Sequence, residues 1–375
     1  MATSQVTVTV ENLAPTNGTR LTPVWVGFHN GNFDTFNSGE AASAALESLA
    51  EDGSNELLSQ AFNASGLGSI DGAVGSAPIQ PSETPSETFD VNTSTGQYFS
   101  FASMVLPSND TFIGNGNPEA YELFDDEGNF LGPEILVLGS QAYDAGTEVN
   151  DEIPANTAFF GQQNPNTGVD ENGVVRLSEG FIPVSEGGQI LADAQFANAD
   201  FTAAGYQFAR ITFTLNSVRG DRSDETIKGT GTDNRLDGKG GDDILLGRGG
   251  NDTIIGGSGD DILKGGSGDD ELTGKKGDDH LRGGSGADVL DGGRGQDRLL
   301  GGSGDDIFVI SNQRGPDRIL DYIDGADQLR LSGSLSFDRL SFEQRGSNTL
   351  IQRGRRTLAI LNDVDATSIT DADFA

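Results

Sequence analysis

The sequence contains no cysteine, which excludes disulfide bonds and thiolate metal sites. Only two histidines occur among its 375 residues. No HExxH motif is present, so the usual helical zinc site of metalloproteases is excluded, and no GxSxG nucleophile elbow is found. We therefore expect that the protein is not an enzyme. A hydrolase with two catalytic carboxylates is the least favoured alternative, because no pair of acidic residues is singled out.

Basic residues are also scarce, with 23 Lys and Arg against 58 Asp and Glu, and the formal net charge is −35. Such a chain repels a phosphate backbone, so we expect no nucleic-acid partner and expect divalent cations as counter-ions. No apolar run approaches the roughly 18 residues of a transmembrane helix. The first residues, MATSQVTVTVENLAP, lack the basic and apolar regions of a secretory signal. We predict no transmembrane segment and no cleaved N-terminal signal.

Charge and glycine content both change near Gly220. Residues 1–219 hold 28 acidic and 4 basic residues, whereas residues 220–375 hold 30 and 19. Glycine becomes frequent at the same point and then recurs at regular intervals. We predict three domains, at residues 1–218, 219–310 and 311–375.

A nine-residue unit repeats nine times from Gly229 onward without an insertion, and a weaker tenth unit begins at Gly220. If Gly256 is position 1, glycine fills position 1 of every unit and a large apolar residue fills position 8. Position 6 is Asn234 in the first unit and aspartate in the others, and we call these the position-6 aspartates: Asp243, Asp252, Asp261, Asp270, Asp279, Asp288, Asp297 and Asp306.

This unit resembles the nonapeptide G-G-x-G-x-D-x-U-x of the repeats-in-toxin (RTX) family, which forms a calcium-binding parallel β-roll. Positions 7 to 9 are expected to form a short strand with position 8 facing inward. Positions 1 to 6 are expected to form a turn that glycine enters at low cost. Two units complete one coil, so each unit stacks on the unit 18 residues away.

The resemblance implies that each calcium ion lies between stacked turns, where two position-6 carboxylates and backbone carbonyls hold it. Six complete carboxylate pairs are available: Asp243–Asp261, Asp252–Asp270, Asp261–Asp279, Asp270–Asp288, Asp279–Asp297 and Asp288–Asp306. Asn234 with Asp252 makes a weaker pair. We therefore predict Ca²⁺ at about six good sites and one weak site. Because the carboxylates repel and only one residue in nine is large and apolar, we expect the roll to fold only with calcium.

The aspartates at position 5 are expected to be solvated, because Asn251, Ala287 and Gln296 replace them in some units. His280, at position 7, is expected to point outward and to have no metal role.

The glycine period stops after Phe308, and alternating apolar and polar residues then predict short strands that cap the open end of the roll. This segment, which ends with Asp371, Asp373 and Phe374, resembles the caps and uncleaved C-terminal signals of proteins exported by type I secretion machinery. A plain cap without signal function is the alternative. We expect the protein to be extracellular or bound at the cell surface.

Residues before the repeats read as about eight strands separated by Gly, Pro and Asn, which favours a β-sandwich. Two short helices are predicted among them, one capped by Ser38 and ending at Gly53, and one capped by Ser54. The predicted fold is thus all-β: an antiparallel sandwich, then a parallel β-roll with a C-terminal β cap.

Three stretches within residues 3–217 resemble the bacterial form of the spondin N-terminal domain: ENLAPTNGTRLTPVWVGFHNGNFDTFNSGEAASAALESLAEDG, FSFASMVLPSNDTFIGN and AYDAGTEVNDEIP. The resemblance implies an antiparallel sandwich with one calcium at a loop end, held by Asp110, Asp144 and Glu148. Glu148 stands where the animal motif has aspartate, so the geometry of this site stays open. The alternative is that the three acids are ordinary loop carboxylates.

These features favour a secreted or surface-attached calcium-binding protein that serves adhesion or extracellular-matrix attachment. Its sandwich would contact anionic surface glycans, lipids or matrix components, and its roll would fold after export. The alternative is a structural surface-layer or matrix component in which the roll assembles or buffers calcium.

Overall fold

The computed structural model describes residues 2–148, 152, 157, 171, 173–186, 188–312 and 315–375. The chain forms two compact units, one from Gln5 to Thr214 and one from Leu215 to Ala375 with the first four residues. Strands account for 43% of the structure and helices for 9%, so the prediction of an all-β fold is confirmed. None of the described helices is long and apolar enough to span a membrane.

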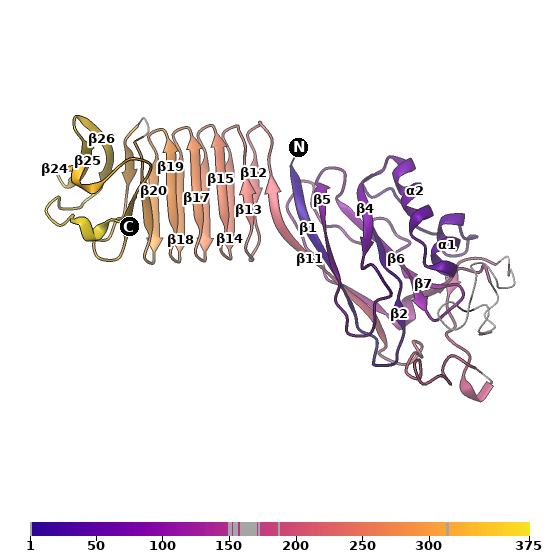
Figure 1. The fold of residues 1–375 in the computed structure, drawn as a ribbon. Coiled ribbons are helices and arrows are strands. Elements are labelled where there is room, and N and C mark those ends of the chain that lie inside the picture. Colours follow the sequence, from indigo (N-terminus) through magenta and orange to yellow (C-terminus); the bar gives the residue numbers. More distant parts are fainter. Residues whose placement is uncertain are drawn as a thin grey trace. The chain divides into compact units, whose positions relative to one another are not determined.

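The first unit contains two sheets (Figure 1). One has the order β10-β9-β7-β6-β3-β4, with β2 beside β6: β2 (Arg20–Leu21), β3 (Val24–His29), β4 (Gly68–Val74), β6 (Tyr98–Leu106), β7 (Thr111–Gly114), β9 (Ala142–Asp144) and β10 (Arg176–Leu177). The other joins β1 (Thr3–Asn12), β5 (Ser86–Asn92), β8 (Ile135–Leu138) and the first part of β11 (Gln207–Arg219). Strand β6 pairs antiparallel with β2, β3 and β7, and the pairs β3–β4, β7–β9, β9–β10 and β8–β11 are also antiparallel, as predicted. The alternation of Val6, Val8 and Val10 with polar residues places all three valines in the core.

Two helices, α1 (Ala44–Asp52) and α2 (Glu56–Ser65), form as predicted, but their first residues differ from the prediction. Ser43, not Ser38, caps α1, because the chain near Ser38 pairs with Val175: the N–H of Gly39 donates to the Val175 carbonyl at 2.7 Å. Short 3₁₀ turns lie at Gly139–Gln141 and Val184–Glu186.

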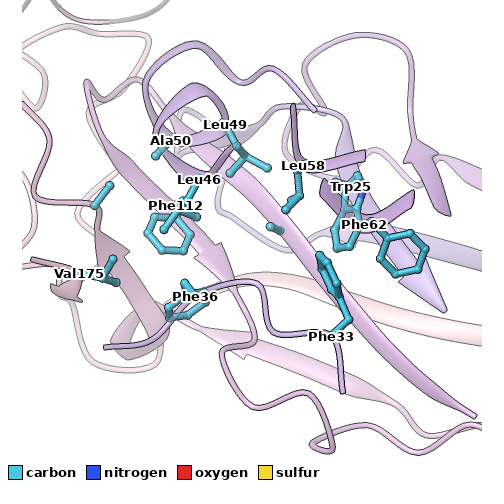
Figure 2. Close-up of a cluster of buried hydrophobic side chains, with 12 residues drawn as sticks. Trp25, Phe33, Phe36, Leu46, Leu49, Ala50, Leu58, Phe62, Phe112 and Val175 are labelled. Atoms are coloured by element: carbon cyan, nitrogen blue, oxygen red, sulfur yellow. The ribbon is translucent and has the colours of Figure 1, made fainter. Parts of the chain in front are cut away.

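The helices pack on the sheet of β3, β6 and β7 through a cluster of buried side chains (Figure 2). Leu46, Leu49 and Phe62 lie against Trp25 and Phe112, and the rings of Trp25 and Phe62 meet edge to face at 5.5 Å. This packing places α1 beside β7, the strand that begins directly after Asp110.

In the second unit, parallel strands stack into a solenoid of about six turns over residues 217–331 (Figure 1). One sheet contains β12 (Thr226–Lys228), β14 (Ile244–Gly249), β16 (Ile262–Ser267), β18 (His280–Ser285), β20 (Arg298–Ser303) and β22 (Asp317–Ile319). The opposite sheet contains the end of β11, then β13 (Arg235–Asp237), β15 (Thr253–Ser258), β17 (Glu271–Lys276), β19 (Val289–Arg294), β21 (Ile307–Ile310) and β23 (Gln328–Leu331).

Each strand of the solenoid pairs with the strand two units away, and position 8 faces inward, as predicted. Leu245, Leu263, Leu281 and Leu299 stack in register and are at most 2% exposed. The prediction of three-residue strands was wrong, because six-residue strands such as Ile262–Ser267 also include positions 1 to 3. Glycine enters these strands because adjacent coils pair there through the backbone, as Gly266 does with Gly284.

The last strands form the predicted cap: β24 (Ser341–Arg345), β25 (Asn348–Arg353) and β26 (Arg356–Leu361). Two antiparallel pairings join them, and β26 pairs in parallel with β22, so the edge strand of that sheet is covered. Two 3₁₀ turns, Phe337–Arg339 and Asp371–Asp373, complete this end, and the Tyr322 hydroxyl donates to Asp373 at 2.9 Å.

Candidate calcium sites

The position-6 aspartates form two ladders along the turns of the roll. Asp243, Asp261, Asp279 and Asp297 belong to one ladder, and Asp252, Asp270, Asp288 and Asp306 to the other. In each ladder the backbone N–H of one aspartate donates to Oδ1 of the next, 18 residues later, at 2.8 to 2.9 Å. The six pairs expected from the sequence are therefore stacked neighbours.

The other oxygen of these carboxylates is buried without a partner. In every position-6 aspartate except Asp306, Oδ2 accepts no hydrogen bond from the described residues. All eight side chains are at most 2% exposed. An unsatisfied buried acceptor costs about 1 to 3 kcal/mol, and more when it is charged. A hard cation among these oxygens would remove that cost, and calcium prefers such oxygen ligands.

At position 1 of several units, a backbone carbonyl oxygen and an unpaired Oδ2 atom lie on the same side of the glycine. A Cβ added to Gly274, at position 1, would lie 2.2 Å from Oδ2 of Asp279 and 2.6 Å from the carbonyl oxygen of Gly292 in the next coil. The same arrangement recurs at Gly238 and Gly247. The missing side chain leaves a small space edged by one carboxylate and one carbonyl oxygen, which fits the mixed oxygen shell of calcium.

The electrostatics of the ladders also favour a bound cation. Burial, followed by repulsion from Asp297 and Asp261, raises the pKa of Asp279 to about 7. Burial raises the pKa of Asp252 to about 7 and that of Asp261 to about 6, and stacked aspartates add to both shifts. Each carboxylate is thus costly to ionise while no positive charge lies beside it.

The ladders extend beyond the nonapeptide array at both ends. At the start, Glu225 holds position 6 of the weak tenth unit, and its N–H donates to Oδ1 of Asp243 at 2.9 Å. At the far end, Oδ1 of Asp317 accepts from the N–H of Asp297 at 3.3 Å, and Oδ1 of Asp327 accepts from that of Asp306 at 3.0 Å.

Sequence reasoning missed Asp317 and Asp327 because they follow their partners by 20 and 21 residues instead of 18. A weaker signal was available. Ile319 and Leu329 stand two residues after these aspartates and face inward, as position 8 does in the repeats. The motif D-x-U, searched without the fixed period, would have found both.

In Asn234, both the nitrogen and the oxygen of the side-chain amide have hydrogen-bond partners within the protein. Its side-chain amide donates to the carbonyl of Leu215 at 2.6 Å, and its Oδ1 accepts from the N–H of Thr230 at 2.6 Å. It therefore lacks the unpaired oxygen that its aspartate neighbours have, which agrees with its predicted weakness as a ligand.

The position-5 residues are exposed, as predicted, but they form a hydrogen-bonded ladder of their own. Oδ1 of Asp242 accepts from the N–H of Asp260 at 2.8 Å, and Oδ1 of Asp260 accepts from that of Asp278 at 2.7 Å. Asn251 fills the same role toward Asp269 at 2.9 Å. These side chains connect successive turns by hydrogen bonds. The acceptor can be the oxygen of an aspartate or of an asparagine, as Asn251 shows.

The sandwich brings together a separate carboxylate cluster. Ligand oxygens of Asp110, Asp144 and Glu171 lie within 4.8 Å of one another. Oδ1 of Asp110 is buried without a hydrogen-bond partner among the described residues. Burial, followed by repulsion from Asp144, raises the pKa of Asp110 to about 8. These features fit a cation at the end of β7 and β9.

The third predicted ligand, Glu148, lies beside this cluster. Its backbone N–H donates to Oδ2 of Asp110 at 3.3 Å, and its side chain is 2% exposed. The stretch AYDAGTEVNDEIP continues past it into residues outside the described ranges. Sequence reasoning missed Glu171, which no local spacing connects to Asp144. Arg176 donates to both Asp144 (3.2 Å) and Glu171 (3.0 Å) and so offsets part of their charge.

His29 is buried and held in place: its Nε2 lies 2.9 Å from the Ser100 hydroxyl, and its Nδ1 accepts from the N–H of Gly31 at 3.1 Å. Burial lowers its pKa to about 4, so the ring is neutral near pH 7. His280 is exposed on β18, as predicted.

Comparisons with known proteins support both resemblances. Residues 11–158 match the model of the family Spondin_N. Residues 219–254, 246–281 and 273–308 match the RTX calcium-binding nonapeptide repeat. No curated protein matches the sequence.

Two solved structures are similar to parts of the chain. The extracellular lipase LipA from Serratia marcescens is 19% identical over 42% of this chain and 39% of its own, with a TM-score of 0.23. The AlgE6R3 subunit of the Azotobacter vinelandii mannuronan C5-epimerase is 22% identical over 42% of this chain and 80% of its own, with a TM-score of 0.22. This chain thus spans well under half of the lipase. The family matches show the domain architecture of the chain, which joins a spondin N-terminal domain to RTX calcium-binding nonapeptide repeats.

Proposed function

We propose that this protein is an extracellular calcium-dependent attachment protein without enzymatic activity. Its RTX repeats imply calcium binding and a location outside the cell. The observation that carries the proposal is the set of stacked, buried carboxylates, of which seven have an Oδ2 atom without a hydrogen-bond partner in the part of the chain that the structure describes. We propose the position-6 aspartates, with Asp317 and Asp327, as the calcium ligands of the roll.

Calcium would also control where the protein folds. The buried carboxylates oppose folding while no cation is bound, and ion binding then contributes directly to the folding free energy. A chain that stays unfolded in the cell suits export through type I machinery, followed by folding where calcium is abundant. Circular dichroism of the full chain during an EGTA titration tests this step. A spectrum that does not change would remove it.

We propose that the sandwich contributes the attachment. The cluster of Asp110, Asp144 and Glu171, with Glu148 beside it, would hold one calcium ion that bridges to anionic groups on a glycan, lipid or matrix component. The test is calcium-dependent binding of an Asp144→Ala variant to native cell surfaces. Loss of binding with an unchanged calcium-induced fold supports the proposal, and full binding contradicts it.

A structural surface-layer or matrix component is the second candidate. It is favoured by the compactness of the second unit, which contains the roll and its cap and has its own core. Deleting residues 1–217 separates the two functions. Surface assembly that survives the deletion favours the structural role, and its loss favours attachment through the sandwich.

A further inference from the structure

The two outer faces of the roll differ in charge. Along β12, β14, β16, β18, β20 and β22, positions 7 and 9 point outward because position 8 points inward. Among the described residues at these positions there is no carboxylate, and five are lysine or arginine. We call this surface the basic face. The opposite sheet has Asp237, Glu271 and Asp291 at the equivalent positions. In a chain of net charge −35, a sheet face without an acid is unexpected.

The cations of the basic face form two in-register pairs along the roll axis, offset by two residues because Arg282 is in register with Leu300 and Arg298 with His280. Lys264 on β16 is in register with Arg282 on β18, and Arg298 on β20 is in register with Arg318 on β22. One cation thus comes from each of four successive strands, which are about 4.8 Å apart. The side chains of Lys264, Arg282 and Arg298 are exposed and form no ion pair or hydrogen bond with any described residue. Their charges are therefore available to a ligand.

A pocket of about 230 Å³ lies among these side chains. The residues that line it include Lys264, Arg282 and Arg298 and the apolar Ile262, Leu300 and Leu320. This volume is below the usual range for drug-sized ligands, roughly 300 to 1,000 Å³, and so suits a group of about one sugar ring. Apolar side chains can contact the C–H face of a pyranose, while arginine forks can bind a carboxylate at its edge.

We propose that the basic face binds a linear anionic polysaccharide whose carboxylated sugars lie along the roll axis. A polyuronate carries one carboxylate per sugar, and the face offers one cation per strand. A lipid surface fits less well, because charge interrupts the apolar surface: Ile262 shares β16 with Lys264, and Leu300 shares β20 with Arg298. A nucleic-acid duplex fits less well, because exposed position-5 carboxylates such as Asp260 and Asp278 follow the turns that flank the sheet.

Calcium should strengthen this binding. The carboxylate ladders flank the basic face, and bound calcium would cancel part of their negative potential. Binding of polysaccharide and of calcium would then be coupled, and each would raise the affinity for the other. The basic face is a separate site from the carboxylate cluster of the sandwich, so the proposal does not depend on attachment through that cluster.

The experiment measures binding of the full calcium-loaded chain to immobilised polygalacturonate at physiological ionic strength. The test variant is R282E/R298E. The matched control is R235E/R330E, which makes the same charge change at outward, exposed positions of the opposite sheet. Circular dichroism with calcium checks that both variants fold. We expect the Kd of R282E/R298E to rise at least tenfold and that of the control to change less than threefold.

Three further measurements can overturn the proposal. Equal losses in the two double variants would show a non-specific charge effect. Equal binding to neutral dextran would exclude recognition of the anion. Binding to phosphatidylglycerol vesicles but not to polygalacturonate would assign the face to a membrane. Asp144→Ala distinguishes this site from the sandwich: it should keep polygalacturonate binding whether or not it loses cell-surface attachment.

Discussion

Asp279 lies in the middle of one ladder, and replacing it with asparagine tests the ligand assignment directly. The asparagine carbonyl keeps the bond that Oδ1 of Asp279 accepts from the N–H of Asp261, at 2.8 Å. The change is therefore confined to the unpaired Oδ2, which becomes an amide nitrogen, and to one unit of charge. Because Asp279 belongs to two stacked pairs, with Asp261 and with Asp297, two calcium ions would each lose one charged ligand.

The expected magnitude follows from the loss of a buried charge partner. Removing one partner of a buried charge pair costs about 3 to 5 kcal/mol, and the retained carbonyl oxygen places this change near 3 kcal/mol. If about six ions bind as the roll folds, the penalty is shared among six binding terms. At about 1.4 kcal/mol per tenfold change, 3 kcal/mol over six ions raises the calcium midpoint of folding about twofold.

The assay is a calcium titration of the full chain, followed by far-ultraviolet circular dichroism. Asp278→Asn is the matched control, because it removes the same charge one residue away. Its Oδ1 still accepts from the N–H of Gln296, as Asp278 does at 2.8 Å, and the side chain is exposed. We expect no shift in its midpoint. Equal shifts in the two variants would refute the assignment, because general charge reduction would then explain both.

Three other predictions concern the roll. Folding raises the pKa values of several position-6 aspartates to about 6 or 7. Between about pH 4 and 7 the folded roll without calcium therefore holds more protons than the unfolded chain, so its free energy of unfolding falls as pH rises through this range. Circular dichroism in EDTA should thus show more folded roll at pH 4.5 than at pH 8, and the reverse order would contradict the shifts. Asp317→Asn should raise the calcium midpoint as Asp279→Asn does, while exposed Asp338→Asn should not; identical titrations would show that the ladder ends with the repeats. Gly259→Ala should prevent stable folding, because the φ of Gly259 is +132° and an added Cβ would lie 2.0 Å from the carbonyl oxygen of Gly241. Gly325 has a φ of +80° and open space around it, so Gly325→Ala should lower the free energy of unfolding by only about 1 kcal/mol, as measured by denaturant titration.

Much of the roll could be predicted because its contacts repeat with the sequence period. One unit fixes the inward leucine, the turn glycines and the stacking distance of 18 residues, and the neighbouring units repeat the result. The helix starts were less predictable. Ser38 is as good a cap as Ser43 in isolation, and only the pairing of that segment with Val175 excludes it.

The limit of prediction from the sequence is clearer at the carboxylate cluster of the sandwich. Asp110 and Asp144 could be proposed from a resemblance, but Glu171 joins them only through the path of the folded chain. No local sequence pattern predicts that Glu171 lies near Asp110 and Asp144, because this proximity depends on contacts between distant segments.

The sequence by itself determined that this chain contains RTX calcium-binding repeats that form a roll, which residues face its core, and which eight aspartates form its ladders. Only the tertiary structure decided that the ladders continue to Asp317 and Asp327, and that alternate units collect their basic side chains on one face. The physical reason is the same in both cases. A strict sequence period determines contacts at one fixed separation of 18 residues. The irregular length of the last coils and the distribution of alternate strands between two sheets become visible only in the folded roll.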